Sequence, residues 1–315
     1  MMATILIAGG AGFLGRAMAT QLLHRGDLVV CVDNFVTSER GELSELLDNS
    51  MFTLIEQDIC VPIEQNEAID AVVDLASPAS PIDYLRLPIE TLRVGSVGVL
   101  NLLDLARTQN ARFLLSSTSE VYGDPLEHPQ VESYWGNVNP IGPRSVYDES
   151  KRFAEAATMA NRRTFGVDTR IARIFNTYGP GMRPNDGRVV STFIRQALLG
   201  EDLTIFGDGS QTRSFCYVDD LVRGLIALLD ADPSVVAEPI NIGNPGEFTV
   251  AELAALVLGL IDTPSKVVHL DLPENDPTRR RPDITRAQEL LGWSPTVPLA
   301  DGVARTIEHM AATLL

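Results

Sequence analysis

Two residues of the chain form a pair suited to general base catalysis. Tyr147 and Lys151 are four positions apart, so on a helix both side chains project from one face. The 315-residue chain holds only two lysines and six tyrosines, which makes a chance pairing at this spacing rare. Because an ammonium group close to a phenol favours the phenolate, we expect Lys151 to lower the pKa of Tyr147 toward the range that a general base needs.

A glycine motif near the N-terminus predicts a dinucleotide site. Gly9, Gly12 and Gly15 lie between an apolar run at residues 4–8 and a helical pattern. Glycines at this spacing permit a tight turn and a close approach of the backbone to a pyrophosphate at the helix N-terminus. A motif of this kind can also be an ordinary glycine-rich turn, so its weight depends on the strand that follows.

An acidic residue at the end of that next strand favours NAD. Asp33 follows the apolar residues 28–32, where a carboxylate can accept both ribose hydroxyls of NAD and would repel the phosphate of NADP. Asp58 follows the third apolar run and is placed to meet the adenine. The two carboxylates together predict NAD rather than NADP.

A hydroxyl-rich segment supplies the remaining catalytic candidates. Residues 116–120 (Ser-Ser-Thr-Ser-Glu) end the fifth apolar run, and carboxyl ends of strands bind ligands in open α/β sheets. Such a run can simply form a turn. Thr118 or Ser117 beside Tyr147 would instead hold a sugar oxygen while Tyr147 removes its proton and NAD accepts hydride from the same carbon. Lys151 would also hold the nicotinamide ribose.

Composition limits the classes of partner. The net charge of −17 argues against nucleic acid or an anionic membrane, although arginines gathered locally could still bind a small anion. Candidates for that role are Arg188, Arg213 and the run 279–281. Three scattered cysteines and four histidines without ligand spacing argue against disulfides and against a metal. With no apolar run of membrane length and no basic leader, we expect a cytoplasmic protein.

The order of apolar runs predicts a Rossmann-type, doubly wound parallel sheet, because continuous apolar strands separated by helices are buried on both faces. Residues 1–175 form the expected NAD-binding domain, to which 218–240 return. Residues 176–217 and 241–315 form a smaller C-terminal substrate-binding lobe. The predicted strands are 4–8, 28–32, 52–55, 71–75, 112–116 and 168–174, and the predicted helices include 89–109, 147–165, 189–199, 218–229, 249–261, 284–291 and 301–314.

Longer motifs extend over nearly the whole chain, from residue 9 to about residue 293. They are residues 9–15, 32–35, 75–81, 117–123, 134–136, 139–143, 172–180, 185–190, 209–213 and 280–283. In these stretches the chain closely resembles the extended short-chain dehydrogenase/reductase family, and within it the decarboxylases of UDP-glucuronate. The Pro-Ala-Ser-Pro, Thr-Ser-Glu and Asn-Pro-Ile-Gly-Pro segments are far more specific than the glycine motif.

The resemblance implies a closed redox cycle. Tyr147 deprotonates the C4 hydroxyl of the glucuronate while hydride passes to NAD, and the C4 ketone allows the C5 carboxylate to leave as CO2. The enolate is protonated at C5, hydride returns to C4, and UDP-xylose forms with NAD still bound. Thr118, Tyr147 and Lys151 would act at C4, and Glu120 and Arg280 in the decarboxylation half.

The expected binding residues fall into two groups, and the resemblance also implies a homodimer. The cofactor group is Gly9, Gly12, Phe13, Leu14, Gly15, Asp33, Asn34, Asp58, Ile59, Leu75, Tyr147 and Lys151. The substrate group is Tyr84 near the sugar, Phe206 against uracil, and Asn176, Arg188, Arg213 and Arg280.

The chain departs from the family pattern at three of its positions. Asp74 stands where the family usually has histidine, Gly95 where asparagine is common, and Phe206 where tyrosine is frequent. The first two lie near the cofactor, so they concern its affinity more than the reaction type.

Other functions stay open on these residues. A 4-epimerase shares the fold, NAD and the Tyr/Lys pair, but has no need for Glu120 or Arg280. A 4,6-dehydratase would want an Asp-Glu pair where this chain has Ser119 before Glu120. An oxidative decarboxylase would release a UDP-4-keto-pentose and the reduced cofactor. A non-enzymatic NAD-sensing protein is disfavoured by the retention of Thr118, Tyr147 and Lys151 together.

Overall fold

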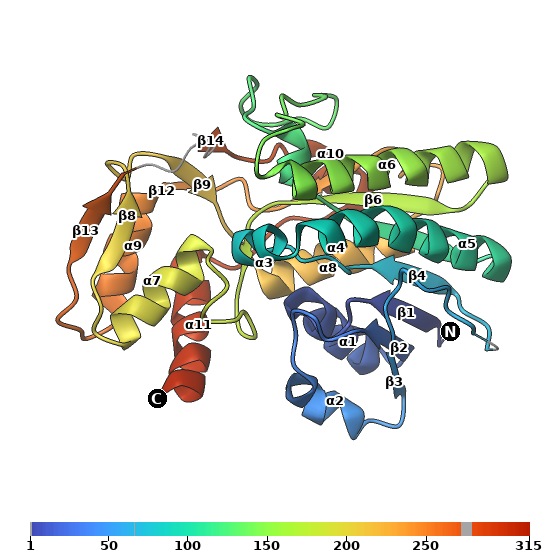
Figure 1. Ribbon diagram of the computed structural model, residues 1–315, viewed down its shortest axis with the longest axis horizontal. Helices are drawn as coiled ribbons and strands as arrows, with labels where there is room; N and C mark the ends of the chain where they lie inside the picture. The colour runs from blue at the N-terminus through green and yellow to red at the C-terminus, as the bar shows by residue number, and fades with distance from the viewer. Residues whose placement is uncertain (1, 66, 272–278) are drawn as a thin grey trace.

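A seven-stranded parallel sheet forms the centre of the protein (Figure 1). The computed structural model describes residues 2–65, 67–271 and 279–315. All neighbouring strands of the sheet are parallel, and their apolar side chains are buried on both faces. The spatial order is β11 (Ile240–Ile242), β6 (Thr169–Ile174), β5 (Arg112–Thr118), β4 (Ala71–Asp74), β1 (Thr4–Ala8), β2 (Leu28–Asp33) and β3 (Phe52–Glu56).

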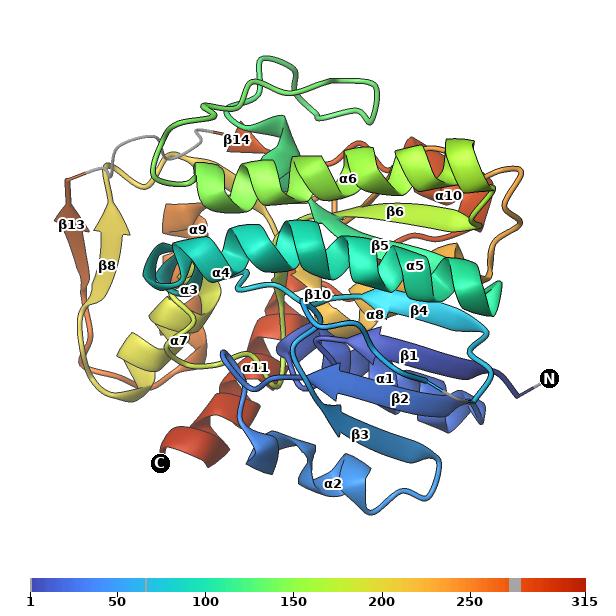
Figure 2. The ribbon, with the colours of Figure 1, turned by 45° about the vertical axis from the view of Figure 1, so that its right-hand side comes forward.

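Helices cover both faces of this sheet, as Figures 1 and 2 show from two directions. One layer is α4 (Pro88–Arg93), the π-helical segment η2 (Val94–Gly98), α5 (Val99–Gln109) and α6 (Ser145–Phe165). The other layer is α1 (Phe13–Arg25), α8 (Val218–Asp230) and α10 (Thr285–Leu291), which packs on α8 and β11. The predicted doubly wound fold is therefore confirmed. The sheet also takes in the short strand β11 at its edge.

The strand order creates a switch point between β1 and β4. From β1 the chain proceeds to β2 and β3 on one side, and then to β4, β5 and β6 on the other. Loops that leave β1 and β4 therefore diverge and leave a crevice at the carboxyl edge of the sheet. Gly9 follows β1 and Leu75 follows β4, so both lie at this crevice.

Short strands and helices form a smaller lobe beside the carboxyl edge of the sheet (Figure 1). Its elements are α7 (Val189–Leu198), β8 (Leu203–Phe206), β9 (Thr212–Ser214), β12 (Glu247–Thr249), α9 (Val250–Leu260), β13 (Val267–Leu270), β14 (Arg279–Arg280) and α11 (Leu299–Leu314). They include a three-stranded sheet, β12-β9-β14, and a two-stranded sheet, β13-β8. The remaining elements are η1 (Arg40–Leu43), α2 (Ser44–Leu47), α3 (Pro81–Arg86), η3 (Ser119–Tyr122) and the pair β7 (Thr177–Tyr178) and β10 (Cys216–Tyr217).

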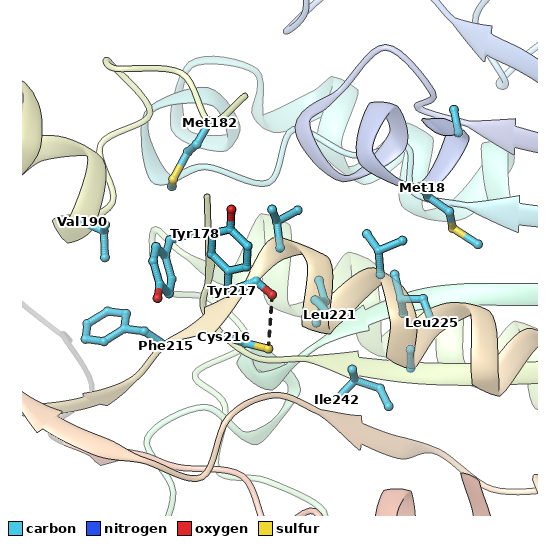
Figure 3. Packing of buried hydrophobic residues seen from close by; sticks show 14 of the residues in the cluster. Met18, Tyr178, Met182, Val190, Phe215, Cys216, Tyr217, Leu221, Leu225 and Ile242 are labelled. Atoms are coloured by element: carbon cyan, nitrogen blue, oxygen red, sulfur yellow. Dashed lines mark hydrogen bonds between the residues drawn. The ribbon is translucent and has the colours of Figure 1, made fainter. Parts of the chain in front are cut away.

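A continuous hydrophobic core joins the lobe to the sheet (Figure 3). The ring of Tyr178 packs edge-on against Phe215 and Tyr217, with centroids 6.5 and 5.8 Å apart. Leu221 and Leu225 of α8 continue this core toward the sheet. Because buried side chains fill the junction, the lobe is held in a fixed position against the crevice.

In the described part of the chain, no helix is long and apolar enough to span a membrane. Across residues 2–65, 67–271 and 279–315, His, Cys, Asp and Glu nowhere gather in threes that could hold a metal ion. The three cysteines are free thiols.

A buried carboxylate ties the C-terminal segment to α8. Asp220 is 1% exposed and accepts hydrogen bonds from the backbone N–H groups of Thr296 and Val297, each at 2.7 Å. Its carbonyl oxygen accepts the indole N–H of Trp293 at 2.9 Å. These bonds fix the chain just before α11.

We predict that Asp220→Ala lowers the free energy of unfolding by about 2–4 kcal/mol, because it leaves two backbone donors of a docked segment without their acceptor. Urea unfolding followed by circular dichroism measures the change. Asp104→Ala, which removes an exposed carboxylate paired with Arg107, is the control and should cost less than about 1 kcal/mol. Equal losses in the two variants would contradict this account of Asp220.

Candidate active site

Two clefts meet at the crevice between β1 and β4. One is lined by the glycine turn, by residues 116–120 after β5, and by Tyr147 and Lys151. The other is lined by residues at or just after the ends of β2 and β3, including Asp33 and Asp58. The clefts share Gly9, Gly12, Thr37, Leu75 and Ser77. A long ligand with two ends could therefore occupy both.

The glycine turn forms a cradle that side chains would fill. Gly9 has a φ of +74°, and a Cβ there would lie 2.7 Å from the backbone nitrogen of Ala76. A Cβ at Gly15 would lie 2.2 Å from the carbonyl oxygen of Gly9. Gly12 caps α1 without a side-chain hydrogen bond, so the first amides of the helix face the cleft uncapped. An anion is favoured at such a helix end.

Asp33 sits at the end of β2 with its carboxylate fixed in place. Its Oδ2 accepts the Ala11 N–H at 2.9 Å, and its Oδ1 accepts the Phe35 N–H at 2.9 Å and the Ser38 hydroxyl at 3.0 Å. The carboxylate lines the second cleft and has lone pairs left for ribose hydroxyls. A phosphate ester at the same place would meet its negative charge.

The residues present fit NAD. The glycine cradle suits the pyrophosphate and Asp33 suits the adenosine ribose. The buried hydroxyl of Ser77, which lies between the clefts, has no hydrogen-bond partner among the described atoms. Such an unpaired buried group indicates a place where a polar ligand binds.

Tyr147 is buried and lines the first cleft. Burial raises its pKa to about 12, while a hydrogen bond with Thr118 and the charge of Arg188 act in the opposite direction. The ring of Tyr84 stacks on it with centroids 5.2 Å apart and planes within 9°. Thr118 and Tyr84 thus fix the phenol from two sides.

The expected lowering of the Tyr147 pKa by Lys151 is not observed. The Lys151 ammonium donates to the carbonyl oxygen of Ser116 at 2.8 Å, and burial lowers its own pKa. The spacing of four residues does place both side chains in one cleft. The ammonium, however, is drawn to the end of β5, so desolvation governs the pKa of the phenol.

A cluster of charges lies next to Tyr147. Glu120 accepts two hydrogen bonds from Arg280, at 2.5 and 2.9 Å, and one from Arg144 at 3.0 Å. The charges of the two arginines outweigh the effect of burial and lower the pKa of Glu120 to about 2. Burial and the Glu120 charge raise the pKa of the neighbouring Asp148 to about 7.

Comparison with known proteins settles the family. Residues 5–243 match the NAD dependent epimerase/dehydratase family. The chain belongs to this family. Since the family is NAD dependent, NAD is the cofactor of this chain, in agreement with the two clefts described above.

Similar sequences are named as decarboxylases. Over 95% of its own length, this chain is 52% identical to "UDP-glucuronic acid decarboxylase 4" of Arabidopsis thaliana. The match spans 66% of that protein, just under two thirds. The chain is 49% identical to "UDP-glucuronic acid decarboxylase 1" of Danio rerio, over 98% of this chain and 73% of that one.

Similar solved structures include epimerases. A UDP-glucose 4-epimerase of Thermotoga maritima with UDP-glucose has a TM-score of 0.88 at 29% identity, over 99% of this chain and 100% of that one. A UDP-glucuronic acid 4-epimerase of Bacillus cereus, in complex with UDP-glucuronic acid and NAD, has a TM-score of 0.85 at 28% identity with the same coverage.

All the predicted cofactor residues of the family member line one or both clefts. Of the predicted substrate residues, Asn176 and Arg188 line the first cleft. Arg280 lines neither cleft, but it donates to Glu120, which lines the first cleft. Phe206 and Arg213 lie on β8 and β9 in the smaller lobe, outside the two clefts.

Sequence reasoning missed four polar residues of this site. Ser77 and Arg183 line the first cleft, and Arg183 also pairs with Asp83. Arg144 and Asp148 belong to the charged cluster around Glu120. Arg144 follows the Asn-Pro-Ile-Gly-Pro segment directly, and Asp148 follows Tyr147, so proximity to motifs was the available signal.

Removal of Arg280 should shift acid unfolding. Glu120 has a lowered folded-state pKa, so its contribution to stability is present above the ordinary pKa of 4.5 and is lost as the pH falls through about 2. In Arg280→Gln only Arg144 remains beside Glu120, so we expect unfolding to begin at a higher pH.

The measurement is circular dichroism during acid titration. Arg279→Gln makes the same change of net charge at the exposed neighbour and should leave the midpoint where it is in the parent protein. An Arg280→Gln midpoint equal to the parent's would remove the ion pair from this account.

Proposed function

We propose that this chain converts UDP-glucuronate to UDP-xylose and CO2 with NAD as a retained cofactor. The observation that carries the proposal is the Glu120–Arg280 pair at the end of β5, next to Tyr147 and Thr118. Oxidation and reduction at C4 need Tyr147 and its neighbours. They do not need Glu120 held by an arginine. The names of the sequence relatives support the same reaction.

The phenol of Tyr147 is the proposed base at the C4 hydroxyl. Thr118 holds the phenol by a hydrogen bond, and the stacked ring of Tyr84 limits its rotation. The phenol oxygen that takes the proton is therefore held in one position. Lys151 lies in the same cleft and is the proposed contact to the nicotinamide ribose. NAD held in the two clefts would supply reversible hydride transfer at C4.

Charge handling at C5 falls to the cluster around Glu120. A ketone at C4 is β to the C5 carboxylate, so loss of CO2 can place the bonding electrons in an enolate. Arg280 and Arg144 carry two positive charges, and Glu120 carries one negative charge. These three side chains together therefore present a net positive charge to the substrate carboxylate and to the enolate. We assign the two arginines to the stabilisation of the substrate carboxylate and of the enolate.

The UDP moiety has its proposed contacts beyond the sugar. Asn176 and Arg188 lie in the first cleft, where an arginine can pair with a diphosphate. We propose that Phe206 and Arg213 complete this site from the smaller lobe. Residues 1–175 with 218–240 would then hold NAD, and 176–217 with 241–315 the UDP-sugar.

A 4-epimerase is the second candidate, favoured by the similarity to epimerase structures. An oxidative decarboxylase that releases a UDP-4-keto-pentose differs only in the fate of the ketone. Incubation of the purified protein with UDP-glucuronate, with and without added NAD, separates these outcomes by NMR of the product and absorbance of reduced nicotinamide. UDP-xylose without net reduction supports the proposal, and UDP-galacturonate or a 4-keto product overturns it.

We predict that Tyr147→Phe lowers kcat by about 10²–10⁴-fold, since it removes the proton-transfer group and keeps the ring that stacks on Tyr84. NAD affinity, measured by calorimetry, should stay near normal. Tyr134→Phe removes another phenol, which accepts the Leu126 N–H outside the clefts, and should keep most of the rate. A Tyr147→Phe enzyme with most of its activity would refute the base assignment.

The chain is proposed to act as a homodimer. Its α4–α6 layer carries exposed apolar side chains on the outer side, which a second copy could cover. They are Ile89, Leu92, Val97, Leu100 and Phe153. We predict that Ile89→Glu with Phe153→Glu yields a monomer in analytical ultracentrifugation, whereas Leu47→Glu on α2 does not. A parent protein that sediments as a monomer would end this proposal.

A further inference from the structure

Asp74 ends β4 inside the active-site crevice and is only partly hydrogen-bonded. It is 1% exposed, and its Oδ1 accepts the Ala76 N–H at 3.1 Å. Its Oδ2 is buried and has no hydrogen-bond partner among the described atoms. An ionised carboxylate in this state is costly unless a positive charge lies close by.

The register of the sheet places the contact of Lys151 on the strand next to this carboxylate. Asp74 is opposite Leu115 in the pairing of β4 with β5, and Lys151 donates to the carbonyl oxygen of Ser116, the next residue along β5. The ammonium therefore lies over the end of the strand that adjoins Asp74. Lys151 is itself 4% exposed, so both charges are withdrawn from water.

Each of these two groups acts on the pKa of the other. Burial raises the pKa of Asp74 to about 6, and the charge of Lys151 opposes that rise. Burial lowers the pKa of Lys151, and the charge of Asp74 opposes that fall. The ionised pair is the form in which each partner offsets the desolvation of the other.

Other ionisable groups around the crevice have different partners. Tyr147, on the helix of Lys151, bonds with Thr118. Glu155, one turn further on α6, accepts from Ser117 at the end of β5 and from Arg173 of β6. Asp33, at the end of β2, accepts from the glycine turn after β1. Among the described residues, the charge acting on Lys151 is that of Asp74.

We propose that Asp74 is a positioning residue for Lys151: its carboxylate keeps the ammonium charged and seated at the end of β5, beside Tyr147 in the cofactor cleft. The catalytic meaning of that position rests on the proposed function. The pairing itself is a property of the free protein. A neutral residue at position 74 would leave a buried ammonium without a counter-charge.

The low lysine content permits a direct test. With Lys151 and Lys266 as the chain's two lysines, protein labelled with [13C]lysine gives two sets of side-chain NMR signals, and Lys266→Gln assigns the exposed one. We expect the pKa of Lys151 to fall by about one unit or more in Asp74→Asn. Asp220→Asn alters another 1%-exposed carboxylate, which lines neither cleft, and should leave the pKa of Lys151 unchanged.

A measurement on the parent protein covers the case in which Asp74→Asn fails to fold. The Lys151 signal should then show a second inflection near pH 6, where Asp74 takes up its proton. A Lys151 pKa that is equal in parent and Asp74→Asn overturns the inference, and so does a parent signal without that inflection. If Lys151 also acts in turnover, the alkaline limb of the rate profile should move to lower pH in Asp74→Asn.

The two proposals fail separately, because the lysine titration needs no substrate. A shifted Lys151 pKa in a protein that does not convert UDP-glucuronate supports the pairing and rejects the function. Normal conversion by a protein whose Lys151 pKa is insensitive to position 74 supports the function and rejects the pairing.

Discussion

Burial of a parallel sheet on both faces is the constraint on which the rest of the structure depends. The strand interiors are mostly apolar, and the polar side chains that line the crevice leave the sheet at the ends of strands. Asp33, Asp74 and Thr118 are the last residues of β2, β4 and β5. Because all seven strands run the same way, these ends meet at one edge, and the change of direction at β1 opens a crevice among them.

Withdrawal from water gives these few groups their chemistry. Desolvation raises the pKa of Tyr147 and of Asp74, and lowers that of Lys151. Glu120 differs because two arginines surround it, and it remains a carboxylate in spite of its burial. The site therefore holds fixed charges next to groups that can lose or gain a proton, which suits a reaction that moves protons and forms charge at adjacent carbons.

The smaller lobe contributes to this edge through long-range packing. Arg280 lies on β14, paired with β9, and reaches Glu120 across 160 residues of chain. The core around Tyr178 and Phe215 fixes that lobe against α8, so the arginine arrives in a defined place. Binding of a substrate between lobe and sheet would act on both sides of this junction.

The sequence by itself determined the sheet, the glycine cradle and the Tyr147–Lys151 pair, because apolar runs and helical spacing are local properties. The strands of the smaller lobe have only two to four residues each, so their sequences show too little periodicity to predict them. Only the tertiary structure decided that Lys151 donates to Ser116, and that Arg144 joins Arg280 at Glu120. Such partners come from different elements, and which side chains meet depends on how the sheet, α6 and the lobe pack together.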